Sequence, residues 1–174
     1  MRTDEKESKS WRFLIAVDDS DSSHKAVSYV ANLLSHSNGA AHVILFHLLP
    51  PLPPQLVEHG GAEDPDEERR RGQSLAKKRE RWIEQAQSDA EPFMESSKAV
   101  LRRARIRDED IDKRYVTTMH AGVAQEALEA ASELGCGTIV VGRKSFPWYR
   151  ELTQQHVADA LVQHAENIAV CVVE

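Results

Sequence analysis

The segment WRFLIAVDDSDSS, at residues 11–23, contains a run of apolar residues that ends abruptly in acids and serines. A short apolar run bounded by charged residues predicts a buried β-strand. The acids and serines that follow are typical of a helix start, where their side chains accept hydrogen bonds from backbone N–H groups. The segment therefore predicts a strand that leads directly into a helix.

Apolar runs and helical patterns alternate along the rest of the chain. Further short apolar runs predict strands at 41–49, 111–118, 138–141 and 168–173. Helical patterns follow the first strand and also cover 66–105, 123–134 and 151–164, and Pro92 is expected to kink or split the long one. This alternation is typical of an α/β fold, a parallel sheet with helices on both faces. Ligands of such folds bind beyond the carboxyl ends of the strands, which directs attention to 18–23, 47–54 and 142–157.

The chain divides into a polar tail and one larger domain. Its 174 residues suit a single domain. Residues 1–10 predict a disordered N-terminal tail, so the folded domain is expected over 11–174. Residues 58–110 form a charged, mainly helical elaboration that begins with an exposed loop over 58–71. Its role stays open between spacer, lid and docking surface.

Charge and composition argue against several kinds of partner. The net charge of −6 gives no general attraction to nucleic acid or to an anionic membrane. No stretch reaches the roughly 18–20 apolar residues that cross a bilayer. With a polar N-terminus, these features predict a cytoplasmic protein with neither partner. The spacing of the histidines favours no metal site, and Cys136 and Cys171 are expected to be small buried hydrophobes.

The acids of the opening segment also occur in other phosphate chemistries. Paired acids after a first strand resemble the magnesium site of response-regulator receivers, and Asp19-x-Asp21 resembles the nucleophile motif of haloacid-dehalogenase-like phosphatases. The first class needs an aspartate near 117–118 and the second needs acids near 142–144, and neither is present. A near-match to a P-loop at 137–145 has a strand where the phosphate loop belongs. These readings are therefore disfavoured.

Four segments, in their order and spacing, resemble the universal stress protein family. They are IAVDDSDSS at 15–23, VILFHLLPP at 43–51, HAGVAQEALEAASELGCGTIVVGRK at 120–144 and VADALVQHAENIAVCVVE at 157–174. The resemblance implies a Rossmann-like fold of the adenine nucleotide alpha hydrolase type. It further implies a five-stranded parallel sheet in the order 3-2-1-4-5 and a dimer formed through the last strand.

The resemblance also implies a site for ATP or AMP with Mg. Asp18 is implied on the ribose and adenine side, and His47 and Leu48 in the adenine pocket. The phosphates are implied beside a loop of pattern G-x-x-G, nine residues, then G-[ST]. The candidate residues on this loop are Gly142, Arg143, Ser145, Gln155, His156 and Val157.

The phosphate pattern is only partly present. Ser145 stands at its second glycine, and Gln155 and His156 replace the final G-[ST]. Side chains thus stand where bare backbone would approach phosphates, and Asp19 adds a negative charge nearby. We therefore expect a non-catalytic regulatory module in stress response, with weak or absent ATP binding. The alternative is an adenine-nucleotide sensor with slow hydrolysis or autophosphorylation, and helix capping alone also accounts for the opening acids.

The last predicted strand, from Ile168 to Val173, is apolar on both faces. A terminal strand of this kind leaves an edge that would aggregate unless another chain paired with it. The sequence therefore predicts a homodimer through this strand, and a further protein partner stays open.

Overall fold

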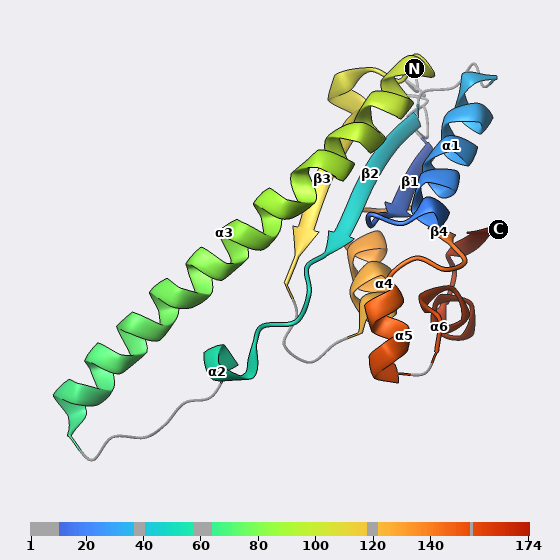
Figure 1. The fold of residues 1–174 in the computed structure, drawn as a ribbon. Helices are drawn as coiled ribbons and strands as arrows, with labels where there is room; N and C mark the ends of the chain where they lie inside the picture. The colour runs from blue at the N-terminus through green and yellow to red at the C-terminus, as the bar shows by residue number, and fades with distance from the viewer. Residues whose placement is uncertain (1–10, 37–40, 58–63, 118–121, 154) are drawn as a thin grey trace, which may run out of the picture.

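The computed structural model describes residues 11–36, 41–57, 64–117, 122–153 and 155–174 (Figure 1). The tail predicted over 1–10 lies outside the described residues. The strands are β1 (Trp11–Ala16), β2 (Ala41–Leu48), β3 (Ile111–Val116), β4 (Thr138–Gly142) and β5 (Ala169–Val173). The helices are α1 (Asp21–Ser35), α2 (Pro54–Val57), α3 (Pro65–Arg103), α4 (Val123–Glu133), α5 (Pro147–Thr153) and α6 (Val157–His164), and η1 (Asp108–Asp110) is a single 3-10 turn.

The five strands form one sheet in the order β3-β2-β1-β4-β5, and every neighbouring pair is parallel. The predicted α/β class and the predicted strand order are therefore confirmed. The central strand β1 pairs with β2 on one side and with β4 on the other, in a register that places Ala16 beside Phe46 and Val141. The strand order thus reverses at β1, so the ends of β1, β2 and β4 meet at one edge.

The two faces of the sheet carry separate apolar cores. Because successive side chains of a strand point to opposite faces, Phe13 and Ile15 pack with α1 and α3, whereas Leu14 and Ala16 pack with α4 and α6. Figure 1 shows α3 running across one face and extending at its N-terminal half well beyond the sheet. The helices therefore cover both faces, as predicted.

The opening acids and serines do form a helix cap. Ser20 is the N-cap of α1, and its Oγ accepts a hydrogen bond of 3.2 Å from the Ser23 N–H. Ser23 Oγ in turn accepts a bond of 3.0 Å from the Asp18 N–H. These contacts confirm the capping interpretation and fix the turn between β1 and α1.

The charged elaboration is one continuous helix of 39 residues. The prediction of a loop over 58–71 is wrong for residues 65–71, which belong to α3. Asp64 caps the helix, because its Oδ1 accepts a hydrogen bond of 3.0 Å from the Asp66 N–H. Pro65 suits the first helical turn. Pro92 does not split the helix. Pro92 and Ser88, whose carbonyl loses its usual partner, are both exposed, so water can replace the missing hydrogen bond.

The single helix expected over 151–164 is instead two helices, α5 and α6. Thr153 Oγ1 donates to the Tyr149 carbonyl at 2.8 Å and accepts from the Gln155 N–H at 3.3 Å. A side chain that satisfies backbone groups in this way competes with the helix and ends it. The chain restarts as a helix at Val157, with His156 as its N-cap.

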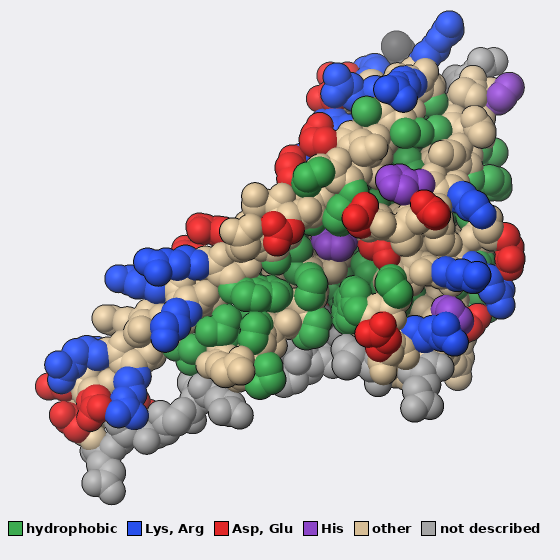
Figure 2. All heavy atoms as spheres, viewed as in Figure 1, with side chains coloured by type: hydrophobic (Ala, Val, Ile, Leu, Met, Phe, Trp, Pro, Cys, Tyr) green, Lys and Arg blue, Asp and Glu red, His purple; other side chains and the backbone are tan. Residues whose placement is uncertain are grey.

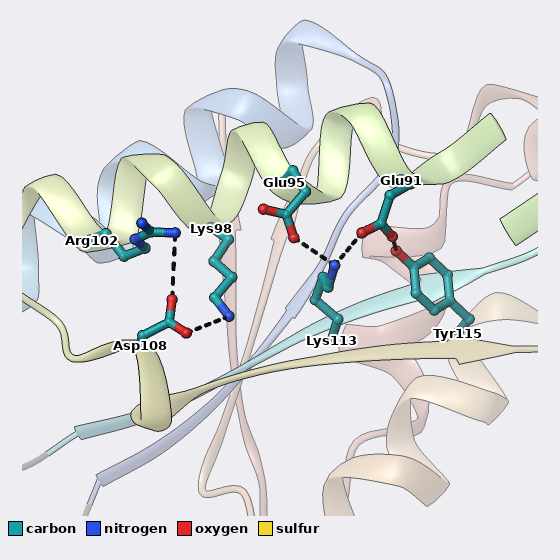
Figure 3. Close-up of polar contacts among 7 residues, drawn as sticks. All are labelled: Glu91, Glu95, Lys98, Arg102, Asp108, Lys113 and Tyr115. Carbon is teal, nitrogen blue, oxygen red and sulfur yellow. Dashed lines mark hydrogen bonds and ion pairs between the residues drawn. The ribbon is translucent and has the colours of Figure 1, made fainter. Parts of the chain in front are cut away.

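An ion-pair network holds α3 against the edge strand β3 (Figure 3). Lys113 Nζ contacts Glu91 Oε1 and lies 2.6 Å from Glu95 Oε1, and the Tyr115 hydroxyl donates to Glu91 Oε2 at 2.5 Å. Hydrogen bonds from Lys113 and then Tyr115 lower the pKa of Glu91. The network fixes the C-terminal half of α3 alongside β3.

Candidate functional site

A pocket of about 430 Å³ opens where β1 and β2 end, beside α3. The loop between β1 and α1 contributes Asp18, Asp19 and Ser20 to its lining, and the end of β2 contributes His47 and Pro50. Figure 2 shows hydrophobic side chains, with acidic side chains near them, between α3 and the α5 region. The pocket thus occupies the sheet edge at which α/β folds bind their ligands.

One face of α3 forms the opposite wall. Its lining residues are Trp82, Gln85, Ala86, Asp89, Ala90 and Phe93. Their spacing of three and four residues places them on one side of the helix. Sequence reasoning assigned none of them to a site. The spacing of Trp82, Ala86, Ala90 and Phe93 was the available signal, but it does not tell where along the sheet the helix packs.

The carboxylate of Asp18 is buried and hydrogen-bonded within the chain. Its side chain accepts hydrogen bonds from the Ser20 N–H at 3.2 Å, from Ser20 Oγ at 2.5 Å and from the Phe146 N–H at 2.5 Å. Asp18 is only 7% exposed. It therefore joins the loop after β1 to the loop after β4, and three of its acceptor positions are used within the chain.

The backbone N–H groups after β4 are also occupied. The N–H of residue 143 donates to Val173 O at 2.8 Å, and that of residue 144 donates to Ser22 Oγ at 3.0 Å. The N–H of residue 145 donates to Gly142 O at 3.1 Å, and that of residue 146 donates to Asp18 Oδ2 at 2.5 Å. A phosphate-binding loop needs such donors to face the ligand. Here four consecutive donors are committed to the protein itself.

Phe146 packs the loop after β4 against His47 of β2. It has a left-handed backbone, with φ of 55°, and a fully buried side chain. Its ring stacks on His47 with 6.0 Å between centroids and meets Trp148 edge-on at 6.4 Å. The left-handed conformation is uncommon for a residue with a bulky side chain. The hydrogen bond from its N–H to Asp18 and the ring contacts hold Phe146 in place.

His47 lines the pocket and is only 7% exposed. Its Nδ1 lies 2.7 Å from the Val17 carbonyl, and since a carbonyl only accepts, Nδ1 carries the proton. Burial lowers the pKa of His47, against the opposing effects of the Val17 hydrogen bond and the Asp18 charge. The ring is therefore neutral near pH 7, with Nε2 as an acceptor. Nε2 makes no hydrogen bond to any residue that the structure describes.

Gly142 serves the packing of β4 against α1. A Cβ at this position would lie 2.2 Å from the Ser22 carbonyl oxygen and 2.7 Å from Ser145 Oγ. Ser145 is 2% exposed, and its Oγ has no hydrogen-bond partner among the described residues. The two residues thus lie in a tight junction of the backbone rather than in the pocket lining.

The other sequence-predicted site residues also lie outside the pocket lining. Leu48 belongs to the core beneath α4, and Val157 is buried at the start of α6. Arg143 Nη1 lies 3.4 Å from Glu174 Oε1, beyond the end of β5. Gln155 Nε2 bonds Gln163 Oε1 at 3.2 Å, and His156 begins α6. The pocket brings together Asp18 and His47 alone among the nine residues named from the sequence.

The pocket is rich in hydrogen-bond acceptors and acids. Asp18, Asp19 and Asp89 lie in its lining, and the described lining contains no Lys or Arg. Gln85 Nε2 donates to Asp89 Oδ1 at 2.8 Å, so this carboxylate is held in place at the wall of the pocket. A magnesium-bound triphosphate does not fit this set of residues, since it needs donors and positive charge around its oxygens.

No described helix is long and apolar enough to span a membrane. Among the same residues, no group of three or more His, Cys, Asp or Glu side chains is placed to hold a metal ion.

The fold and the position of the pocket define an α/β protein with a pocket at the carboxyl ends of its strands. The model of the universal stress protein family matches residues 11–173, so this chain belongs to that family. No curated protein matches the chain.

Solved structures with the same fold come from the same family. A universal stress protein family member from Burkholderia pseudomallei has a TM-score of 0.61 at 18% identity, with 93% of this chain and 94% of that chain covered. A universal stress protein in complex with cAMP has a TM-score of 0.55 at 17% identity, with 95% and 97% covered. The protein from Archaeoglobus fulgidus in complex with dAMP has a TM-score of 0.54 at 16% identity, with 94% and 98% covered. These likenesses establish the fold.

Proposed function

We propose that this chain is a cytoplasmic, dimeric regulatory module of stress response that is non-catalytic and does not bind ATP. Its family membership supports the regulatory role. The observation that carries the proposal is the commitment of the four N–H groups of residues 143–146 to acceptors within the protein. A phosphate would have to break these bonds and would meet acids in return.

The engagement of Asp18 supports the non-catalytic character. A general base or nucleophile needs an accessible lone pair close to the reacting group. The Asp18 carboxylate is buried and accepts three hydrogen bonds, two from Ser20 and one from Phe146. It acts as a structural link between loops.

An adenine-nucleotide sensor, with slow hydrolysis or autophosphorylation, is the second candidate. The pocket of about 430 Å³ at the switch of strand order favours it, and the structural neighbours with cAMP and dAMP show that this fold accommodates such ligands. A monophosphate makes fewer demands on N–H donors than ATP does. AMP with Mg is therefore included in the test.

The dimer is proposed through the outer edge of β5. The Ala169 N–H donates to Gly137 O at 3.0 Å, and Val173 O accepts from the Arg143 N–H at 2.8 Å. Because alternate residues of a strand direct their backbone groups to opposite sides, Val170 and Val172 direct theirs away from β4. Sedimentation should show a dimer for the wild type and a monomer for Val172→Pro, since proline removes one outward donor. A monomeric wild type would contradict the dimer.

The test of the nucleotide proposal has two steps. Purified protein is denatured and the supernatant is analysed for released nucleotide, and the native protein is then titrated calorimetrically with ATP and with AMP, each with Mg²⁺. We expect no released nucleotide and no ATP heat at millimolar concentration. Micromolar binding of AMP alone would favour the second candidate, and phosphate release from ATP would contradict the non-catalytic assignment.

A further inference from the structure

We propose that the pocket beside α3 binds an organic cation, an ammonium group carried on a flat apolar ring system. The inference goes beyond the proposed function and rests on it in one respect, namely that no triphosphate occupies the same space. It is carried by the charge, the hydrogen-bonding capacity and the aromatic content of the pocket lining.

The charge of the lining has one sign. Asp19 from the loop after β1 and Asp89 from α3 are exposed carboxylates on two different walls. No Lys or Arg belongs to the described lining. A concave surface with charge of one sign concentrates ligands of the opposite sign. The pocket therefore selects against anions.

The hydrogen-bonding capacity points to a ligand that donates. Only 7% of the His47 surface is exposed, and its Nε2 is an acceptor with no partner among the described residues. Asp89 accepts one bond from Gln85 and, as a carboxylate, has further lone pairs. An ammonium group has N–H donors and no acceptor, so it complements both residues. A phosphate or carboxylate ligand would face repulsion at the same positions.

The aromatic residues supply surfaces for a flat ring. Trp82 on α3 and Trp148 on α5 both line the pocket and are half-buried, and Phe93 lies against His47 with 4.9 Å between ring centroids. Aromatic faces attract cations and stack on flat apolar groups. These residues come from separate elements, so the pocket exists only when α3 is held in place.

The size of the pocket suits a small ligand of this kind. Its volume of about 430 Å³ lies within the range of roughly 300–1,000 Å³ found for small-molecule sites. A two-ring ammonium compound such as tryptamine is a suitable probe. Tryptophol and indole-3-acetate have the same rings with a neutral and a negative substituent, so the three compounds separate charge from shape.

The experiment is calorimetric titration of the full chain with the three compounds at neutral pH. We expect tryptamine to bind more tightly than tryptophol, and indole-3-acetate to show no binding. Asp19→Asn and Asp89→Asn should each weaken tryptamine binding by about two- to fivefold and leave tryptophol unaffected. Trp82→Leu should weaken the binding of both tryptamine and tryptophol by a similar factor. Glu84→Gln removes the same charge from α3 at a position outside the lining, so it should change the affinity for neither tryptamine nor tryptophol.

The outcomes distinguish this inference from the proposed function. Three results would each overturn the cation site. They are equal binding of tryptamine and indole-3-acetate, no binding of tryptamine at millimolar concentration, and unchanged tryptamine affinity in both aspartate variants. None of these results bears on ATP. Micromolar ATP binding would overturn the proposed function instead, whatever tryptamine does.

Discussion

The carboxylate of Asp18 accepts a hydrogen bond from the backbone N–H of Phe146, which lies 128 residues later in the chain, with 2.5 Å between Oδ2 and N. This contact joins the loop after β1 to the loop after β4. It turns the acid of the opening segment toward the protein, and it uses one of the donors that a phosphate would need. This pair therefore occupies both the Asp18 carboxylate and the Phe146 N–H with each other.

Asp18→Ala should lower the free energy of unfolding by about 1–3 kcal/mol, because it leaves the buried N–H of Phe146 without an acceptor. Urea denaturation followed by circular dichroism measures the change. Asp19→Ala, at an exposed neighbour, should stay within about 0.5 kcal/mol of the wild type. Equal effects of the two substitutions would show that the hydrogen bond does not stabilise the fold.

Gly142→Ala should destabilise the protein by about 1–3 kcal/mol. The added Cβ would lie 2.2 Å from the Ser22 carbonyl oxygen, so β4 and α1 would have to separate. Gly137→Ala is the matched control, since a Cβ at that position meets nothing within 4 Å. Thermal unfolding of the two variants checks the expectation, and a stable Gly142→Ala would mean that the junction is not tightly packed.

The network between α3 and β3 should give a measurable coupling energy. In a double-mutant cycle of Glu91→Gln and Lys113→Met, we expect about 0.5–1 kcal/mol, because the Glu91 side chain is 47% exposed and solvent screens the pair. Glu84→Gln combined with Lys113→Met should be additive. A coupling of zero for the first pair would contradict the role of the network in holding α3.

The same network should respond to acid. The pKa of Glu91 is lowered from 4.5 by hydrogen bonds from Lys113 and Tyr115. A carboxylate with a lowered pKa contributes stability above its unfolded pKa and loses it as the pH falls through the folded value. The coupling energy should therefore be constant above pH 5 and decline below about pH 4.5. A coupling that is the same at pH 3 and pH 7 would contradict this expectation.

His47 should make the free energy of unfolding depend on pH in a range that begins higher than that of Glu91. Burial lowers its pKa below 6.5, so the unfolded chain binds a proton first as the pH falls. The free energy of unfolding therefore decreases below pH 6.5, and the contribution ends below the folded pKa. Asp18 and Tyr115 are the titratable groups beside the ring. His47→Gln should reduce this slope by at most about 1.4 kcal/mol per pH unit. An unchanged slope in urea titrations at several pH values would contradict a neutral buried ring.

Much of the fold could be predicted from the sequence because local patterns carry it. The apolar run of β1, the capping residue Ser20 and the alternation of strands and helices are local features. Two boundaries were wrong for physical reasons that are also local. Asp64 and Pro65 start α3 earlier than the charge pattern indicated, and Thr153 ends α5 by bonding the backbone.

The site could be predicted only in part because it depends on contacts between distant segments. Asp18 follows the first predicted strand, His47 lies near the end of the second, and both line the pocket. Phe146 could not be predicted, since its left-handed backbone and its place over His47 depend on the Asp18 contact. Trp82 and Asp89 could not be predicted either, because only the packing of α3 on the sheet brings them to the strand ends.

The central claim is that the N–H groups of residues 143–146, directly after β4, are bound within the protein and are not available to phosphate. Calorimetric titration of the full chain with ATP and Mg²⁺ tests it most directly. The committed donors of residues 143–146 and the acidic lining predict no binding heat at millimolar ATP. Saturable binding with micromolar affinity would show that the loop opens for phosphate, and it would contradict the account.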